Sequence, residues 1–388
     1  MQGKSKILLL SSAYLPHVGG SELAIKNITD RLTDFEFDLI TARLDKNTPE
    51  YEKLGNVNVH RLGFGSKIDK FLLPVLGFLK VRDLYYRQDL FKQVLPVIHA
   101  YQASYGAGAG WLLKNFYPKL PFLITLQEGK NLEEQGPLIN FFRRLIIKKA
   151  DWATAISRYL KEYILKINKE LKVDIIPNGV DIASFSIKFS YGELTDLENK
   201  LGIKPDDKVI ISVSRLVSKN GSDLLIKAMA ILNNGGDKYK LILAGDGSLK
   251  KELVSSIKYH GLEDKVIFAG TVETKDLPLY LKISDVFVRP SRSEGLGSAF
   301  LEAMAAGVPI IGTKVGGIPD FLQDRKTGLF STLEPEDIAF KIRIILENDK
   351  LKEEMVNNAA VLVRERYDWE KIAEKFRELY FKILSTKS

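Results

Sequence analysis

Short apolar runs rich in β-branched residues alternate with segments of helical periodicity along most of the chain. In the first half, buried strands are predicted at 6–12, 37–42, 56–62, 122–127 and 151–157. Helical spacing of apolar residues appears at 21–32 and 158–170. Repeated strand–helix–strand units predict a parallel sheet with helices on both faces.

The alternation restarts after residues 184–207, which are predicted to be a polar connector of low order. Further strands are expected at 208–214, 240–245, 265–270, 285–290 and 308–313, and the last amphipathic helix at 369–386. Two such series predict two doubly wound α/β domains, 1–183 and 184–368, followed by a C-terminal helical segment at 369–388. Ligands bind beyond the C-terminal ends of parallel strands, so the expected site is the cleft between these domains.

Composition narrows the class of protein. The 388 residues are enough for about two domains. The fractions of hydrophobic (45%) and charged (27%) residues are ordinary for a soluble globular protein. Cysteine is absent, which excludes disulfides and thiolate sites and fits the cytoplasm. The longest suspicious apolar stretch, 71–79, falls far short of the roughly 20 residues that span a bilayer, so no transmembrane helix is expected.

The positive charge is concentrated in one window. The whole chain carries a formal net charge of +8, and residues 51–150 hold 15 Lys/Arg against 7 Asp/Glu. Within this window, the segment 67–94 mixes lysine and arginine with phenylalanine, leucine and tyrosine. Such a segment suits an interfacial helix on an anionic membrane surface. A core-packing helix with a solvated lysine face fits the same composition.

The stretch at 291–307, SRSEGLGSAFLEAMAAG, carries the strongest chemical signal. It predicts a loop after a strand, then a short helix with Ser298 as its N-cap. Glycines let a ligand approach the backbone, and the amides of the helix N-terminus suit a diphosphate. Glu294 and Glu302 would then suit hydroxyl-rich rings on either side, which is the layout of a nucleotide-sugar. A purely structural role for both carboxylates fits the spacing equally well.

This stretch resembles the E-x7-E signature of the retaining glycosyltransferases of family 4, which have the GT-B fold. The stretches 11–22, 176–181, 214–228 and 241–253 are similar to consecutive blocks of the same family. The resemblance implies two Rossmann-like domains facing across a deep cleft. The N-terminal domain would bind the acceptor and the C-terminal domain the nucleotide-sugar donor. The final helix would cross back to the first domain.

The resemblance also implies roles for individual residues. Glu302 matches the glutamate on the nucleotide ribose, and Glu294 the one at the donor sugar. Arg215 matches the cation that stabilises the departing diphosphate, a task that suits a guanidinium. The remaining residues expected on the donor side are Gly19, Gly20, Asn220, Gly295, Leu296, Gly297 and Ser298.

Two positions depart from the family pattern. Relatives often carry a lysine five places after the arginine, where this chain has Asn220, so Lys219 is expected to reach the phosphates from the neighbouring position. Gln127 stands where many relatives have a histidine, and glutamine can orient a group but cannot act as a base. Glu128 is expected on the acceptor side, or alternatively as a cap of the segment after it.

The resulting expectation is a retaining, metal-independent glycosyltransferase of polysaccharide, glycolipid or glycan synthesis that uses a UDP- or GDP-sugar and no cofactor. It would be cytoplasmic, or peripheral at the inner face of the membrane. The histidines show no metal-ligand spacing, and no D-x-D motif occurs. The alternatives are a catalytically inactive nucleotide-sugar-binding module, a dehydrogenase and a nucleic-acid binder. The last two lack their motifs, so no nucleic-acid partner is expected.

Overall fold

The computed structural model describes residues 4–386, except 87–95, 130–131, 133 and 235–237. The chain divides into two compact units. The first unit consists of two segments, one up to Asn178 and one from Trp369 onwards. The second unit spans Gly179–Asp368. The division falls before the predicted boundary at 183/184, so residues 179–183 belong to the second unit. The last helix belongs to the first unit.

The first unit is built on an eight-stranded sheet in the order β3-β4-β2-β1-β5-β6-β7-β8. Only β3 runs antiparallel to its neighbour. The central strands are almost wholly buried, as expected where helices cover both faces. The strands are β1 (Ser5–Leu10), β2 (Phe35–Ala42), β3 (Tyr51–Leu54), β4 (Val57–Leu62), β5 (Val97–Tyr101), β6 (Phe122–Leu126), β7 (Trp152–Ala155) and β8 (Lys172–Ile175).

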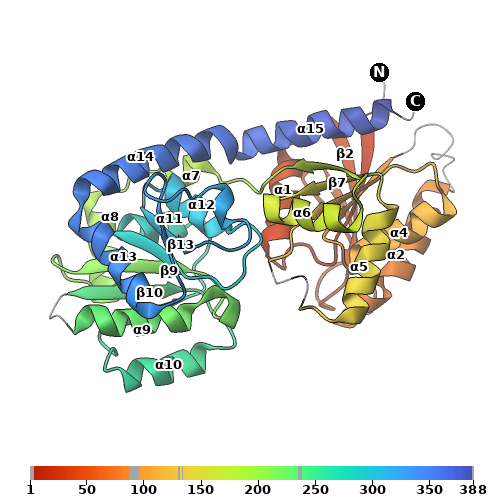
Figure 1. Ribbon diagram of the computed structural model, residues 1–388. Helices are drawn as coiled ribbons and strands as arrows, with labels where there is room; N and C mark the ends of the chain where they lie inside the picture. Colours follow the sequence, from red (N-terminus) through yellow and green to blue (C-terminus); the bar gives the residue numbers. More distant parts are fainter. Residues whose placement is uncertain (1–3, 87–95, 130–131, 133, 235–237, 387–388) are drawn as a thin grey trace. The chain divides into compact units, whose positions relative to one another are not determined.

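Helices cover both faces of this sheet (Figure 1). The helices are α1 (Gly20–Arg31), α2 (Asp69–Tyr86), α4 (Tyr105–Phe116), α5 (Pro137–Lys149), α6 (Arg158–Ile167) and α15 (Trp369–Ser385). Side chains alternate along β1, so Ile7 and Leu9 face the layer formed by the first and last helices. On the other face, the glycine-rich helix α4 packs between α2 and α5.

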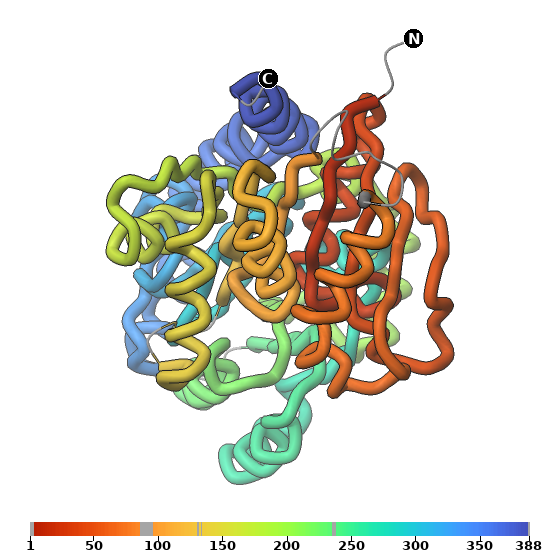
Figure 2. The backbone as a smooth tube through the Cα atoms, turned by 90° about the vertical axis from the view of Figure 1, so that its right-hand side faces the viewer, coloured from red at the N-terminus to blue at the C-terminus, as the bar shows by residue number. Residues whose placement is uncertain are grey.

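The last helix, α15, completes the core of the first unit. It lies beside α1, as the dark blue end of the chain shows (Figure 1, Figure 2). Tyr380 reaches the sheet, where its hydroxyl lies 2.7 Å from Nδ1 of His99. Nε2 of His99 lies 2.6 Å from the hydroxyl of Thr125. Burial lowers the pKa of His99 to about 3, so this histidine is a neutral part of the core.

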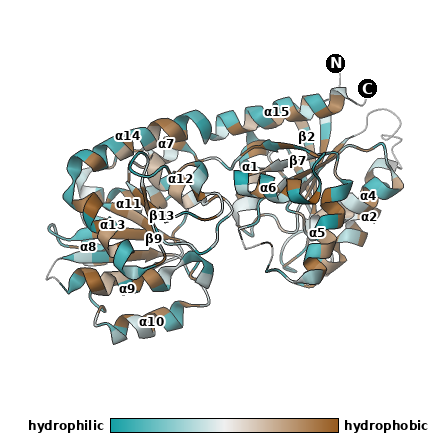
Figure 3. Cartoon of the chain, in the orientation of Figure 1, coloured by the Kyte–Doolittle hydropathy of each residue, from teal (hydrophilic) through white to brown (hydrophobic). Residues whose placement is uncertain are grey.

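The second unit has a six-stranded, all-parallel sheet in the order β11-β10-β9-β12-β13-β14. Figure 3 shows helices such as α9 and α13 carrying both hydrophobic and hydrophilic residues, as expected of helices that cover a sheet. The strands are β9 (Lys208–Val213), β10 (Tyr239–Ala244), β11 (Val266–Gly270), β12 (Val286–Arg289), β13 (Ile310–Thr313) and β14 (Leu329–Ser331). The helices are α7 (Ile182–Phe185), α8 (Tyr191–Leu201), α9 (Ser222–Asn233), α10 (Lys250–Tyr259), α11 (Leu277–Lys282), α12 (Ser298–Ala305), α13 (Pro335–Glu347) and α14 (Asp349–Arg366), with 3-10 turns at Ser218–Asn220 and Ile318–Asp320.

The predicted low-order connector at 184–207 is wrong, because it contains α8. Ser190 caps this helix and Glu193 returns the bond to the backbone of Ser190, which is a capping box. Gly202 ends it in the left-handed conformation. These signals are present in the sequence, but the segment is too polar to stand out by hydrophobic periodicity. Strand β5 and helix α4 were also missed, since YGAGAGW has the composition of a turn.

Candidate active site

The strand order of the second sheet identifies where a ligand would bind. Numbered along the chain, its strands run 3-2-1-4-5-6, so the order reverses between β9 and β12. In open parallel sheets the crevice beyond the strand ends at such a reversal holds the ligand. Arg215 and Lys219 follow β9, and Glu294 follows β12. The fold therefore brings these three predicted residues to the same edge of the sheet.

Polar bonds tie the two loops to each other. Arg292 forms a two-pronged ion pair with Asp223, with N–O distances of 2.8 and 2.6 Å. Its backbone amide donates to the carbonyl of Lys219 at 2.7 Å. Gly221 has a φ of +73°, and a Cβ there would lie 2.0 Å from the carbonyl oxygen of Pro290. The close approach of the loops therefore depends on glycine at this position.

Cations surround the carboxylate of Glu294. Oε2 accepts a hydrogen bond of 2.7 Å from Nη2 of Arg289, and Oε1 lies 3.7 Å from Nζ of Lys219. Burial lowers the pKa of Lys219, Glu294 opposes this effect, and the charges of Arg289 and Arg215 add to it. Lys219 and Arg289 thus face one carboxylate, and Arg215 lies near enough to Lys219 for its charge to act there. The cluster has the excess of positive charge that a diphosphate requires.

Helix α12 begins at this cluster. Its N-cap is Gly297, with a φ of +97°, and Ser298 is the first helical residue, so the predicted N-cap role of Ser298 is wrong. Over the described residues, no side chain caps this end of the helix, although the amide of Phe300 donates to the carbonyl of Gly297 at 2.9 Å. The amide of Gly295 donates to Oε1 of Glu294 at 3.2 Å. Ser298 and the preceding Leu296 and Gly297 remain at the N-terminus, where an anion is stabilised.

Glu302 lies one turn into α12 and is partly buried. Burial raises the pKa of its carboxyl to about 7, and the positive charge of Arg289 opposes this rise. The group is therefore poised between its neutral and ionised forms near neutral pH. When ionised, a carboxylate in this position can accept hydrogen bonds from a pair of hydroxyls.

Asn220 braces the loop rather than facing a ligand with its amide nitrogen. Its side chain is buried, and Nδ2 donates to the carbonyl of Arg215 at 2.7 Å. This bond closes the turn between Arg215 and Lys219. Oδ1 of Asn220 has no hydrogen-bond partner among the described residues, so the contact with a donor that the sequence suggests would leave this bond intact if made through the oxygen. Lys219, by contrast, keeps a partly exposed ammonium group at the cluster.

Arg289 is the member of the cluster that sequence reasoning missed. It is the last residue of β12 and is buried, five residues before Glu294. Its guanidinium carbon lies 4.7 Å from the centre of the Phe300 ring. The available signal in the sequence was an arginine at the end of an otherwise apolar strand. The sequence alone did not indicate that Glu294 would be its partner.

The corresponding edge of the first unit carries amide side chains. Oε1 of Gln127 accepts a weak hydrogen bond of 3.4 Å from Nδ2 of the buried Asn178. Gln102, which follows β5, has a φ of +66°, a conformation that is costly for a residue other than glycine and is often found at functional sites. Its Nε2 donates to the hydroxyl of Ser21 at 3.4 Å. These amides can bind or orient hydroxyl groups.

Glu128 and the glycine pair are already engaged with the backbone of the first unit. The two oxygens of Glu128 accept bonds from the amides of Ala103 (3.0 Å) and Gln127 (2.9 Å), and burial raises its pKa. Glu128 thus caps the segments that precede it; the alternative role as a cap of the segment after it involves residues 130–131, which lie outside the described structure. Gly19 is the N-cap of α1, and Gly20 is its first residue. A Cβ on Gly19 would lie 2.5 Å from the Glu22 carboxylate, which occupies this helix end.

Comparison with known proteins identifies the family. The family described as "Glycosyl transferases group 1" matches residues 195–362, and "Glycosyltransferase Family 4" matches residues 18–184. The two matches are consecutive and cover most of the chain. This chain is a family 4 (group 1) glycosyltransferase. The predicted family and enzyme class are thereby confirmed.

Individual relatives agree with this assignment. An uncharacterised glycosyltransferase of Methanocaldococcus jannaschii is 29% identical, and the match covers 97% of each chain. The N-acetyl-alpha-D-glucosaminyl L-malate synthase of Bacillus anthracis is 27% identical over 76% of each chain. Each match covers more than half of the length of this glycosyltransferase.

Solved structures show the fold. A sucrose-phosphate synthase from Thermosynechococcus elongatus superposes with a TM-score of 0.85 at 20% identity, over 98% of this chain and all of that one. An Anabaena protein in complex with UDP and glucose gives a TM-score of 0.79 at 23% identity, over 97% and 100% of the chains. The glycosyltransferase therefore has the predicted GT-B fold of two parallel-sheet α/β domains.

Two further properties concern metals and membranes. Among the residues that the structure describes, no cluster of three or more histidine, aspartate and glutamate side chains could hold a metal ion. Over the same residues, no helix combines the length and apolar character needed to span a bilayer.

Proposed function

We propose that this glycosyltransferase moves a sugar from a UDP- or GDP-sugar to a hydroxyl acceptor, with retention of the anomeric configuration. The observation that carries the proposal is the cluster at the N-terminus of α12, in which Lys219 and Arg289 contact Glu294 and Arg215 lies near Lys219. The cations and helix amides match a diphosphate. The carboxylates of Glu294 and Glu302 match the rings on its two sides.

The proposed reaction is a front-face displacement. The bond from the anomeric carbon to the diphosphate oxygen breaks as the acceptor oxygen forms its bond on the same face. Arg215 and Lys219 stabilise the charge that develops on the departing diphosphate, and this diphosphate takes the proton of the acceptor hydroxyl. Fixed charges aimed at a developing negative charge are among the largest contributions to catalysis. Gln127 would orient the sugar or acceptor, because it cannot take a proton near neutral pH.

We propose that no divalent cation or other cofactor takes part, since protein cations and helix amides already balance the diphosphate. Full activity in EDTA is the expected result. Strict dependence on Mg²⁺ or Mn²⁺ would contradict this part of the proposal.

The decisive experiment is a thermal shift of the full chain with a panel of nucleoside diphosphates and nucleotide-sugars. UDP comes first in the panel, because the Anabaena protein was solved with UDP and glucose. Ligand at a hundredfold excess over its Kd stabilises a native state by about 2.7 kcal/mol. A shift with one base that disappears in Glu302→Ala supports the proposal. No shift with any member of the panel contradicts it.

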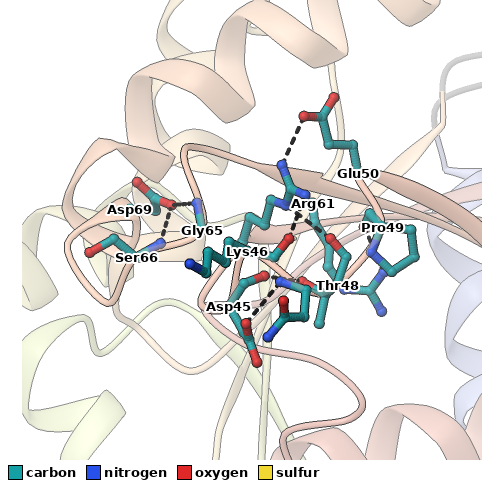
Figure 4. A network of polar contacts seen from close by, with 11 residues as sticks. Asp45, Lys46, Thr48, Pro49, Glu50, Arg61, Gly65, Ser66 and Asp69 are labelled. Atoms are coloured by element: carbon teal, nitrogen blue, oxygen red, sulfur yellow. Dashed lines mark hydrogen bonds and ion pairs between the residues drawn. The ribbon is translucent and has the colours of Figure 1, made fainter.

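The acceptor is proposed to belong to polysaccharide, glycolipid or glycan synthesis, presented at the cytoplasmic face of an anionic membrane. Support comes from α2, the described part of the basic segment 67–94; residues 87–94 lie outside the described structure. Its start is fixed by Asp69, whose carboxylate accepts bonds from the amides of Gly65 and Ser66 (Figure 4). The helix buries one side, yet exposes large apolar residues on the other: Phe71, Leu72, Val75 and Leu79.

The N-terminal end of α5 has the same character. Four large apolar residues are exposed there, and cationic residues line an open cavity of about 460 Å³ between α5 and α6. The apolar residues are Leu138, Ile139, Phe141 and Phe142, and the cations Arg144, Lys148 and Lys166. Exposed apolar residues beside cations suit the interface of an anionic bilayer. For α2, the alternative of a core-packing helix accounts for the buried side but not for the exposed apolar side.

Co-sedimentation with vesicles tests the membrane proposal. Binding to vesicles of one part phosphatidylglycerol and three parts phosphatidylcholine is expected at low salt, and not to phosphatidylcholine alone. Phe141→Ser with Phe142→Ser should weaken it, whereas Phe340→Ser, at an exposed position of the second unit, should not. Absence of binding at low salt would contradict the proposal.

A further inference from the structure

We propose that Arg289 is a positioning residue for sugar transfer, which holds one carboxylate oxygen of Glu294 and leaves the other for a hydroxyl of the donor sugar. This inference rests on the proposed function, since it assigns Arg289 a part in recognising the donor.

Arg289 is a buried charged residue at a position where an apolar side chain would be expected. Its side chain is 6% exposed at the end of a strand whose other residues are apolar. Nη2 bonds to Glu294 at 2.7 Å, whereas Nη1 reaches only the carbonyl of Val213 at 3.3 Å. Nε is buried and, over the described residues, has no hydrogen-bond partner. A buried charge is costly, and an apolar residue would serve the strand better.

The surrounding chain is shaped around the Arg289–Glu294 pair. A Cβ on Gly297 would lie 3.0 Å from Nη2 of Arg289 and 3.3 Å from Cγ of Glu294. The pair therefore occupies the space that a side chain at 297 would take. A Cβ on Gly316 would lie 1.7 Å from the backbone carbonyl oxygen of Glu294. Phe300 lies under the guanidinium and fixes its plane.

The two oxygens of Glu294 therefore differ. Oε2 is committed to Arg289 at 2.7 Å. Oε1 lies 3.7 Å from Nζ of Lys219, beyond hydrogen-bond length, and 3.2 Å from the amide of Gly295. When Lys219 turns to a diphosphate, Oε1 keeps a free lone pair in a fixed direction. A carboxylate held in this way loses little conformational freedom on binding a hydroxyl.

Two variants of the full-length protein test this role. Arg289→Met keeps the apolar stem over Phe300 and removes the guanidinium, and Arg289→Lys keeps the charge without the planar fork. Calorimetry gives the Kd values of UDP and UDP-glucose, or of GDP and GDP-mannose if the wild type prefers guanosine. The ratio of these Kd values measures what the sugar adds to binding.

We expect Arg289→Met to weaken binding of the nucleoside diphosphate less than it weakens the contribution of the sugar, because Arg289 bonds to the carboxylate of Glu294 and its charge reaches the phosphates only through space. The sugar's contribution and kcat should each fall by about tenfold or more, as when one charge-assisted bond is lost. Arg289→Lys should recover part of both. If Arg289→Met fails to fold, the same two quantities are measured for Arg289→Lys, and both are expected to be lower than in the wild type.

Lys282→Met is the matched control. Nζ of Lys282 donates to the carbonyl of Ala306 at 2.6 Å, at the other end of α12, so this variant should lower Tm without changing the sugar's contribution. The inference is overturned if Arg289→Met also lowers Tm and nothing else. A wild type that binds no nucleotide at all would instead overturn the proposed function, and this inference with it.

Discussion

The two units end their sheets in loops at corresponding edges, and these loops carry different charged and polar groups. In the second unit, Lys219 and Arg289 contact the carboxylate of Glu294, and Arg215 adds its charge beside Lys219. The loops after β9 and β12 join there through the Arg292–Asp223 ion pair. In the first unit, the loops after β5 and β6 hold Glu128 with backbone amides and pair Gln127 with Asn178. One edge is suited to a diphosphate, and the other to neutral hydroxyls. The parallel sheet provides the place, and the loop residues decide the ligand.

The largest effect should come from the cationic edge. Lys219→Met is expected to lower kcat by about 10²–10³-fold, the usual cost of removing one group that stabilises developing charge. Steady-state kinetics with the donor found by thermal shift measures it. Lys238→Met removes an exposed lysine with only a surface ion pair and should leave kcat unchanged. Equal kinetics for the two variants would remove the distinction between the edges.

The buried His99 should make the stability of the first unit sensitive to acid. The unfolded chain protonates His99 near its ordinary pKa of 6.5, whereas the folded chain does so only near 3. The unfolded state therefore binds more protons between these values, and stability falls as the pH falls. The loss at pH 5 is about 2 kcal/mol.

Urea unfolding at pH 5 and pH 7 measures this loss. Tryptophan fluorescence reports the first unit alone, because Trp111, Trp152 and Trp369 all belong to it. His99→Gln should show a smaller difference between the two pH values. The same difference in both proteins would show that His99 does not cause it.

Nucleotide binding by the second unit should strengthen with rising pH. If ionised Glu302 accepts the hydroxyls of the ribose, its pKa of about 7 predicts that the Kd of the nucleoside diphosphate falls about tenfold between pH 6 and pH 8. Glu302→Gln should show only the ionisation of the ligand's own phosphate. Calorimetry at the two pH values compares them, and parallel curves for wild type and variant would argue against this role.

The smallest effect is expected at the edge of the first unit that carries Glu128. In Glu128→Gln the side-chain carbonyl can still accept one of the two amide bonds, so kcat should fall by less than about fivefold. Kinetics at saturating donor would measure the change. A loss as large as that of Lys219→Met would make the first unit's edge catalytic, and the contrast between the edges would no longer hold.

Much of the fold could be predicted from the chain itself, because buried parallel strands must be continuous apolar runs and covering helices must be amphipathic. Helix α8 and strand β5 escaped prediction for opposite reasons. The helix depends on its caps rather than on an apolar face, and the strand is one short run before a glycine-rich helix.

The sequence by itself determined the order of strands and helices and the spacing of Glu294 and Glu302 within one loop–helix element, because both are local properties of the chain. Only the tertiary structure decided which residues become partners. Arg289 meets Glu294 because Gly297 leaves room for the pair, and Asn220 turns back to the carbonyl of Arg215. Tyr380 meets His99 across 281 positions of the chain. The direction of a buried side chain depends on the space and charges that distant segments provide, and no local pattern contains that information.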